Sequence, residues 1–256
     1  MLPVMFIGHG SPMNAIEDNE YSRTWRKIGE SINKPSVIVC VSAHWVTKGT
    51  KILVSEEPRT IYDFYGFPKE LYEVDYTVKG SKSVANRILS LIGTEATLVD
   101  DWGIDHGTWS VLKHMFPNAD VPVVQISING NATPEELYEI GTKLKALRNE
   151  NVLLLGSGNI VHNLRMVDFG INGGFPWAYE FDKYIKDSIV SRKYDNVIQY
   201  SRYGNIAKYS IPTTEHFNPI LFILGATDEK DEVKIYNESC VYGSLSMTSY
   251  VFGHNS

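Results

Sequence analysis

Four short apolar runs constrain the fold of this chain more than any other feature. They cover residues 3–7, 36–41, 121–128 and 152–155, and each is rich in Val, Ile or Leu and bounded by Gly, Pro, Asn or Ser. Continuous apolar character over so few residues is typical of strands that are covered on both faces. The runs therefore predict a central, mostly parallel sheet that is buried between layers of helices.

Helical patterns lie between these runs. Residues 81–92, 133–148 and 177–192 each repeat apolar positions with the spacing of one helix face. The middle segment also carries a start signal, because Thr133 can cap a helix whose third residue is Glu136. Strands that alternate with helices predict an α/β fold, here a three-layer sandwich around a mixed, mostly parallel sheet.

Three further segments bear on the organisation of the chain. Residues 245–251 alternate apolar and polar side chains, which predicts an antiparallel edge strand. The charged residues 228–232 indicate a solvated loop, and the aromatic-rich residues 48–76 indicate a lid or a pocket wall. Because no repeat, low-complexity tract or long linker interrupts the sequence, we expect one domain over residues 1–256.

Composition narrows the classes of function. The 256 residues include 24 Lys and Arg against 30 Asp and Glu, a net charge of −6, whereas a nucleic-acid-binding protein needs a basic face. No apolar run approaches the ~20 residues of a membrane helix, and the first residues lack the basic start of a signal peptide, so we expect a cytoplasmic protein. Cys40 lies in an apolar run, which predicts a core residue, and a disulfide between Cys40 and Cys240 stays open.

Three of the seven histidines stand just past predicted strands. His9, His44 and His162 each follow the carboxyl end of a different strand. In parallel α/β sheets the ligand crevice forms at that edge, so we expect the three side chains to converge. His106 and His216 share the glycine or proline neighbours of this group, and the other two histidines do not. Because imidazole is the commonest transition-metal ligand, the set predicts a metal site.

The same turns allow two other interpretations. Residues 156–158 read Gly-Ser-Gly, but they lack the Lys-Ser/Thr of a P-loop and the third glycine of the dinucleotide motif. Ser11, Ser42 and Ser157 stand near histidines, but the sequence holds no Gly-x-Ser-x-Gly nucleophile elbow. A nucleotide site and a serine nucleophile are therefore less favoured than a metal site.

Short motifs rich in His, Gly and aromatic residues follow one another along nearly the whole chain. They occupy residues 8–13 (GHGSPM), 42–45 (SAHW), 60–68 (TIYDFYGFP), 105–109 (DHGTW), 158–164 (GNIVHNL), 215–216 (EH) and 243–247 (GSLSM). In this order they resemble the 4,5-DOPA dioxygenase extradiol family, which belongs to the class III, LigB-type extradiol ring-cleavage dioxygenases. The resemblance implies a LigB-like α/β sandwich with a single catalytic extradiol dioxygenase domain.

The resemblance also implies a non-haem divalent metal held by His9, His44 and His216. His162 would stand beside the metal as a fourth ligand or as the catalytic base, and His106 would line the pocket and contact substrate or dioxygen. Related ring-cleaving dioxygenases bind iron through two histidines and a glutamate, whereas an all-histidine site suits zinc as well as iron. Fe²⁺ is the cofactor expected for activity, and Zn²⁺ suits the same site.

The implied reaction inserts O₂ into a catechol that bears a side chain, such as DOPA or caffeate. In this hypothesis His162 is the general base and His106 is a second acid–base group. Aromatic side chains near the motifs either seat the substrate ring or pack in the core, and the candidates are Trp45, Tyr62, Phe64 and Trp109. Asp105 either orients a histidine or is a turn residue.

Two alternatives to a dioxygenase stay open. A zinc-dependent hydrolase on the same scaffold would use zinc-bound hydroxide, with His162 as the base, and would consume no oxygen. A non-enzymatic interaction protein would keep the fold and a vestigial metal pocket, although five intact motif histidines speak against it. The expected partners are a small catechol and O₂, with no nucleic acid and no membrane, and the chain acts either alone or as a homo-oligomer.

Overall fold

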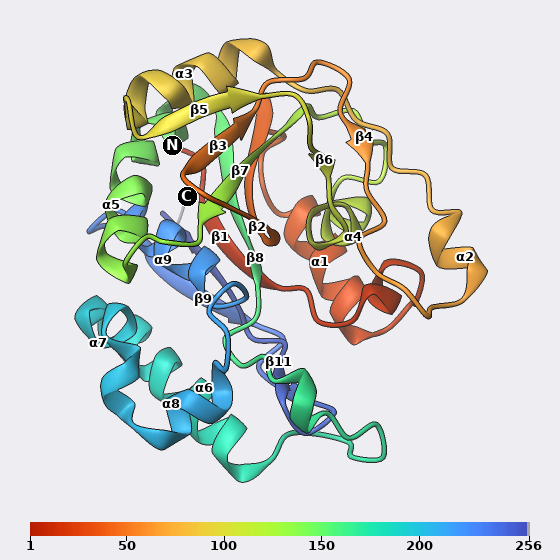
Figure 1. Cartoon of the computed structure of the whole chain (residues 1–256), viewed down its shortest axis with the longest axis vertical. Coiled ribbons are helices and arrows are strands. Elements are labelled where there is room, and N and C mark those ends of the chain that lie inside the picture. The colour runs from red at the N-terminus through yellow and green to blue at the C-terminus, as the bar shows by residue number, and fades with distance from the viewer. Residues whose placement is uncertain (255–256) are drawn as a thin grey trace.

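A sheet of eight strands forms the centre of the computed structural model, which describes residues 1–254 (Figure 1). The strand order is β5-β3-β7-β2-β8-β1-β12-β9. In that order the strands are Ala96–Val99, Thr50–Leu53, Val123–Asn129, Val37–Thr47, Val152–Gly158, Val4–Gly8, Ser249–Gly253 and Glu232–Tyr236. The strands β7, β2, β8 and β1 run parallel to one another. β12 is antiparallel to both of its neighbours, β1 and β9. This mixed, mostly parallel sheet confirms the predicted fold class.

Helices cover both faces of the sheet and form the outer layers (Figure 1). α1 (Glu20–Glu30) and α4 (His106–Met115) contribute to the apolar core on one face. α3 (Lys82–Ile92), α5 (Pro134–Leu144) and α9 (Asn218–Gly225) contribute to the core on the other face. The molecule therefore has the predicted three layers.

The central strands supply both cores. In β1, Val4 and Phe6 belong to one apolar cluster, whereas Met5 and Ile7 belong to the other. All four side chains are fully buried, because successive side chains of a strand point to opposite faces and both faces are covered here. This explains why the strands read as continuous apolar runs in the sequence.

The remaining elements lie below the sheet and to its right in Figure 1. The remaining helices are α2 (Lys69–Tyr72), α6 (Pro176–Val190), α7 (Tyr194–Ile198) and α8 (Asn205–Ser210). Two small sheets pair β4 (Arg59–Thr60) with β6 (Gly103–Ile104) and β10 (Cys240–Val241) with β11 (Leu245–Ser246). Short 3-10 helices occupy Pro12–Ala15, Lys145–Glu150, Leu164–Met166 and Tyr200–Tyr203.

The three predicted helices are present as α3, α5 and α6. α5 begins after Thr133, whose side chain accepts from the backbone N–H of Glu136 while the Glu136 side chain accepts from the backbone N–H of Thr133. This is the predicted capping box, and Ser81 caps α3 in the same position. α5 ends at Leu144, earlier than predicted, because the chain tightens into a 3-10 turn over residues 145–150.

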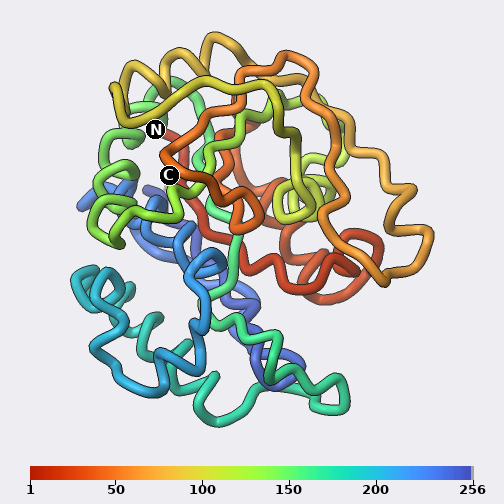
Figure 2. Tube along the Cα trace, viewed as in Figure 1, coloured from red at the N-terminus to blue at the C-terminus, as the bar shows by residue number. Residues whose placement is uncertain are grey.

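Two predictions about the last part of the chain are only partly right. β12 contains the last three residues of the predicted segment 245–251 and is antiparallel as predicted, but it lies between β1 and β9, so β9 is the edge. Its pairing with β1 sets Val4 opposite Phe252 and brings the two ends of the chain together (Figure 2). In the segment 228–232, which was expected to be solvated, Asp231 is buried because it pairs with the buried side chain of Arg148.

Both cysteines are buried and free. Cys40 points into one of the two cores, where the hydroxyl of Thr108 lies 3.2 Å from its sulfur. The structure thus confirms Cys40 as a core residue and holds no disulfide between Cys40 and Cys240.

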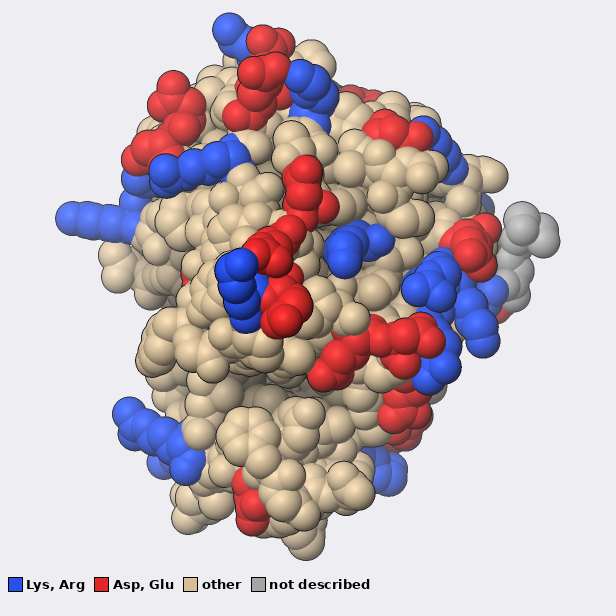
Figure 3. Space-filling model, turned by 90° about the vertical axis from the view of Figure 1, so that its right-hand side faces the viewer, with Lys and Arg blue, Asp and Glu red and all other residues tan. Residues whose placement is uncertain are grey.

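The surface carries charges of both signs. On the face shown in Figure 3, basic and acidic side chains are interspersed, the lower part is mostly uncharged, and neither sign forms a continuous surface. This face therefore lacks the basic stripe with which a protein follows a phosphate backbone. Within residues 1–254, no helix combines the length and the apolar character that crossing a bilayer requires.

Candidate metal centre

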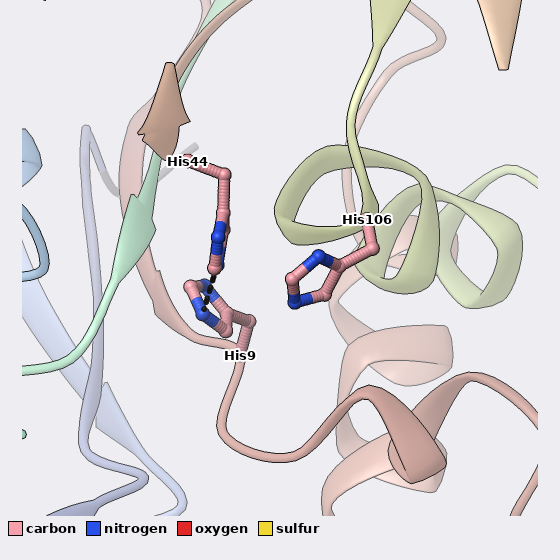
Figure 4. Close-up of side chains that lie close together, drawn as sticks. All are labelled: His9, His44 and His106. Atoms are coloured by element: carbon pink, nitrogen blue, oxygen red, sulfur yellow. Dashed lines mark hydrogen bonds between the residues drawn. The ribbon is translucent and has the colours of Figure 1, made fainter. Parts of the chain in front are cut away.

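Five histidines from five separate segments meet at the carboxyl edge of the parallel strands. His9 follows β1, His44 lies in the last part of β2, and His162 follows β8. His106 is the first residue of α4, and His216 stands in the loop before α9. Figure 4 shows the side chains of His9, His44 and His106 pointing toward one another. The structure thus brings together all five histidines that the sequence singled out.

The five rings form a compact cluster. The ring centroids of His9, His44 and His216 make a nearly equilateral triangle with sides of 5.1, 5.3 and 5.0 Å. The ring of His106 lies 3.9 Å from that of His44 and 6.0 Å from that of His9. His162 stacks on His216, with centroids 3.4 Å apart and planes inclined by 6°. Ligand atoms of His9, His44 and His106 lie within 4.8 Å of one another, and so do those of His162, Glu215 and His216, so each of these two adjoining groups could hold a cation.

Two glycines allow these segments to approach so closely. A Cβ atom at position 158 would lie 2.1 Å from the carbonyl oxygen of His216, and one at position 107 would lie 2.7 Å from the ring of His44. Because glycine has no Cβ atom, Gly158 and Gly107 permit these close contacts. A side chain at either position would push the histidine segments apart. The loop of His216 is also fixed to the end of β8, because the backbone N–H of Asn159 donates to the carbonyl of His216 at 2.8 Å.

In His9 and His216, two of the candidate ligands, a hydrogen-bond partner determines that Nδ1 carries the ring proton. Nδ1 of His9 lies 2.9 Å from the hydroxyl of Ser157, which donates its own proton to the carbonyl of Gly107 at 2.5 Å. Because a carbonyl oxygen can only accept, Ser157 must accept from His9, and Nδ1 of His9 carries a proton. Nδ1 of His216 lies 3.3 Å from the carboxylate of Glu215, which implies the same tautomer.

Asp63 faces the outer nitrogens of two more rings. Its Oδ1 lies 2.9 Å from Nδ1 of His106 and accepts the backbone N–H of the same residue at 2.9 Å. Its Oδ2 lies 3.3 Å from Nδ1 of His44. Burial raises the pKa of Asp63, but the hydrogen bonds and charges of His106 and His44 outweigh this and bring the pKa below its usual value. Nδ1 of His106 still lacks an aligned hydrogen-bond partner in the described structure, so Asp63 faces the two rings as a nearby negative charge.

The inner nitrogens of His9 and His44 face each other. Their Nε2 atoms lie 3.2 Å apart, along the dashed line in Figure 4. Because the ring proton of His9 is held at Nδ1, the hydrogen bond between the two nitrogens places the proton of His44 on Nε2. A cation that replaces this proton can be bound by both nitrogens, and an imidazole whose Nδ1–H is held by a neighbour, as in His9, is the usual form of a metal ligand. The donor set therefore fits a divalent transition metal.

Burial keeps these rings neutral. It lowers the pKa of His44 to about 3 and that of His162 to about 4. Burial also lowers the pKa of His9 and of His216 well below the usual 6.5, and the charges of the neighbouring histidines add to the effect. At neutral pH a metal ion therefore competes with few protons for the inner nitrogens.

Sequence reasoning missed the groups that hold the histidines. Asp63 is the single acidic residue in the motif 60–68, Ser157 entered the argument only as a nucleophile, and Glu215 only as the neighbour of His216. Their position inside or beside motifs was the one available signal. Which nitrogen each group faces depends on how distant segments pack, and no local pattern encodes that.

Asp105 is a helix cap. Its carboxylate accepts from the backbone N–H of Thr108, from the hydroxyl of Ser42 and from the side-chain amide of Gln125. Burial and the nearby charge of Asp63 raise the pKa of Asp105. Asp105 was interpreted either as a partner that orients a histidine or as a turn residue, and these contacts favour the turn residue. By capping α4 it fixes the first turn of that helix and the backbone of His106.

The four aromatic candidates occupy two different places. Phe64 lies edge-on to His106, with ring centroids 5.3 Å apart and planes inclined by 89°. Tyr62 and Trp109 pack with Phe64 in one aromatic group, at 6.3 and 6.1 Å from its ring, and Trp109 is fully buried. Trp45 instead stacks on Trp102 at 5.7 Å within the core.

Comparison with known proteins defines the class of protein. Residues 3–253 match the family described as the catalytic LigB subunit of aromatic ring-opening dioxygenase. The chain belongs to this family, and the resemblance seen in the ordered motifs is confirmed. It is therefore an enzyme that opens aromatic rings with dioxygen, and its histidine cluster could hold the non-haem metal that enzymes of this class use.

Individual relatives narrow this class. The chain is 42% identical to the protein named 4,5-DOPA dioxygenase extradiol from Escherichia coli (strain K12), over 98% of this chain and 95% of that protein. It is 36% identical to the protein of the same name from Beta vulgaris, over 96% and 95% of the two chains. A crystal structure of an uncharacterized protein from Escherichia coli K12 matches with a TM-score of 0.87 and 39% identity, over 99% of this chain and 100% of that one. The relatives thus confirm an extradiol dioxygenase and favour neither a zinc hydrolase nor a non-enzymatic interaction protein.

Proposed function

We propose that this dioxygenase cleaves catechols that carry a side chain, of the DOPA type, in a single catalytic domain over residues 1–256. The names of the two relatives, which align along nearly the whole chain, support this substrate class. The family match over residues 3–253 supports a single domain. Cytoplasmic location and a homo-oligomer stay predictions.

The triangle formed by His9, His44 and His216 is the observation that carries the proposal. Imidazoles that bind one ion through Nε2 at ~2.1 Å in a tetrahedral arrangement place their ring centroids about 5 Å apart. The sides of the triangle measure 5.1, 5.3 and 5.0 Å, and we therefore assign these three residues as ligands. Ferrous iron bound there would supply open positions for a catechol and dioxygen, whereas Zn²⁺ suits the same nitrogens but has no redox chemistry.

The two remaining histidines are proposed to handle protons. Stacking on His216 holds His162 beside the ligand set, and burial lowers the pKa of His162, so its ring is neutral and one ring nitrogen is free to face a substrate hydroxyl. A role for His162 as a fourth ligand is the alternative. The ring of His106 lies 3.9 Å from that of His44, and its Nδ1 lies 2.9 Å from Oδ1 of Asp63, so we assign His106 as the group that accepts and returns a proton.

Phe64 is the aromatic residue with the strongest support as a contact of the substrate ring. Its edge-on packing against His106 sets it at the proton-handling side of the cluster. Tyr62 and Trp109 are proposed as substrate contacts with Phe64, because they pack in the same aromatic group. Trp45 has the least support as a substrate contact, because its ring is stacked in the core.

The proposal is tested by loading the metal-free protein with Fe²⁺ under anaerobic conditions and then adding air and a panel of catechols. We expect O₂ uptake together with a yellow ring-opened product, fastest for catechols with a side chain such as DOPA or caffeate. The same protein loaded with Zn²⁺ is the control, and it should consume no oxygen. Absence of O₂ uptake with every catechol would contradict the proposal, and equal rates for plain and substituted catechols would contradict the substrate class.

His162→Ala tests the assignment of the base. We expect kcat to fall by ~10²–10⁴, the usual contribution of a general base, while KM changes little. Steady-state O₂ uptake at several catechol concentrations separates the two constants, and the iron content of the variant shows whether the metal is retained. A variant that keeps its iron and its wild-type turnover would rule out His162 as the base.

A further inference from the structure

We propose that Asp182 is a positioning residue for His162 and acts through a buried strap formed by residues 244–249. The strap carries most of the motif 243–247, to which the proposed function gives no role. The carboxylate of Asp182 holds the strap, and the strap holds the backbone on both sides of His162. The inference rests on the proposed function, because it takes His162 as the base, and it goes beyond that function by naming what keeps the base in place.

The strap lies alongside the segment that carries His162, and the two segments pair in antiparallel direction. The backbone N–H of Ser246 donates to the carbonyl of Val161 at 2.9 Å. The backbone N–H of Asn163 donates to the carbonyl of Ser244 at 3.1 Å. The residues before and after His162 are therefore fixed to the strap, so the place of the imidazole depends on where the strap lies.

Asp182 binds the strap from α6, which packs against β11 in the lower part of Figure 1. Its carboxylate accepts from the hydroxyl of Ser246 through Oδ1 and from the hydroxyl of Thr248 through Oδ2, the latter at 2.7 Å. Both Ser246 and Thr248 are fully buried, and the hydroxyl of Ser246 also accepts from the backbone N–H of Thr248. Two alternate side chains of the strap thus meet at one carboxylate.

A carboxylate is a costly group to bury at this position. Asp182 is 4% exposed, and the groups that donate to it are two neutral hydroxyls. Burial raises the pKa of Asp182 to about 6, while these hydrogen bonds act in the opposite direction, so the group is ionised at slightly alkaline pH. An apolar side chain would be cheaper to bury, but it could not orient the two hydroxyls. The carboxylate therefore gives the strap a direction that packing alone does not give.

The contact of the strap with β1 does not involve Asp182. The backbone N–H of Gly8 donates to the hydroxyl of Ser249 at 3.0 Å. His9, the next residue along the chain, is held in addition by the hydrogen bond of its own ring. Loss of the contact between the strap and Asp182 should therefore displace His162 more than the ligand His9.

The experiment compares Thr248→Val with Thr248→Ser in the full chain. Valine keeps the shape of threonine and loses the hydroxyl, whereas serine keeps the hydroxyl and loses a methyl group. In the iron-loaded protein at slightly alkaline pH, Thr248→Val should lower kcat for O₂ uptake ~10–100-fold, because a small misplacement of a catalytic group is costly. KM and iron content should stay near their wild-type values, and Thr248→Ser should keep the wild-type kcat. Thr142→Val is the matched control, because the hydroxyl of the exposed Thr142 bonds only within its own helix, to the carbonyl of Tyr138.

Hydrogen exchange in the metal-free protein tests the inference without activity. In Thr248→Val the amide protons of Ser246 and Asn163, which bond between the strap and the His162 segment, should exchange ~10–100-fold faster than in the wild type. The amide protons of β2 should exchange at the wild-type rate, which shows that the opening is local. This measurement uses no metal, catechol or oxygen, so its outcome is independent of the proposed reaction.

Two results would overturn the inference. One is equal exchange at Ser246 and Asn163 in the Thr248→Val and wild-type proteins. The other is a kcat that Thr248→Ser lowers as much as Thr248→Val does, because packing and not the hydroxyl would then be responsible. Asp182→Asn is the second variant, since it removes the charge and keeps the shape, and it should change kcat and exchange in the same direction as Thr248→Val. The double variant should be no worse than the more damaging single variant, because both substitutions break one contact, and additive losses would contradict the proposal.

Discussion

Replacing His9 with alanine should leave the protein folded and almost free of bound metal. The ring of His9 lies 5.1 and 5.3 Å from the two other proposed ligands, and its outer nitrogen is fixed by Ser157. Loss of a ligand should weaken binding by more than the ~10–100-fold that loss of a group behind a ligand costs. After reconstitution with Fe²⁺ and gel filtration, elemental analysis should find far less than one metal ion per chain, and catechol-dependent O₂ uptake should disappear with it.

His254→Ala is the matched control for this prediction. His254 stands at the end of the described chain, where its ring approaches Asp228 and Asp231 and is 43% exposed. Its removal should leave metal content and O₂ uptake unchanged. If the His9→Ala protein instead retains metal at the wild-type level, the ligand assignment is wrong, whatever the identity of the substrate.

The convergence of the histidines could be predicted because it follows from sheet geometry. His9 and His162 follow the ends of β1 and β8, His44 lies in the last part of β2, and parallel strands end at one edge of a sheet. His216 follows no strand, so its place in the triangle depended on the resemblance. Its approach to β8 requires the absent side chain of Gly158, which is a property of the packed fold.

The partners of the histidines could not be predicted for a related reason. A carboxylate such as Asp63 is equally compatible with a solvated loop until the loop is packed against β2 and α4. The same limit explains the error at Asp231, which stands in a run of charged residues typical of a loop yet has a fully buried side chain. Apolar periodicity predicts which faces are covered, and the pairing of buried polar groups is decided by contacts between distant segments.

The central strands of the sheet were predicted more completely than the strands toward its edge. The runs that became β1, β2, β7 and β8 are continuous because helices cover both sides of them, so the pattern and its cause coincide. β12 was placed at an edge because its side chains alternate. Its central position depends on pairing with both β1 and β9, and β9 is only half buried and gave no signal of its own.

Arg148→Ala should cost more stability than any other single change to a side chain outside the histidine cluster. The guanidinium is fully buried and donates to both carboxylate oxygens of Asp231 at 2.7 and 2.8 Å. It also donates to the carbonyls of Leu2 and Ala226, at 2.9 and 3.0 Å. The residue thus connects the start of β1, the end of α9 and the turn before β9, and its removal leaves the buried carboxylate of Asp231 without its cationic partner and takes a donor from two carbonyls.

Removal of one partner of a buried ion pair costs ~3–5 kcal/mol, a large part of the ~5–15 kcal/mol that holds a typical domain together. Urea unfolding of the Arg148→Ala protein should show a midpoint shift of this size. Arg87→Ala is the matched control, because Arg87 pairs with Glu150 in the same two-pronged way at the surface, where water replaces the lost contact. Equal midpoints for the two variants would contradict the prediction. A double variant in which apolar residues replace both Arg148 and Asp231 should recover most of the lost stability. That result would show that the cost comes from the unpaired buried charge. A buried ion pair is expensive to break, but it seldom stabilises a protein more than a well-packed apolar pair does.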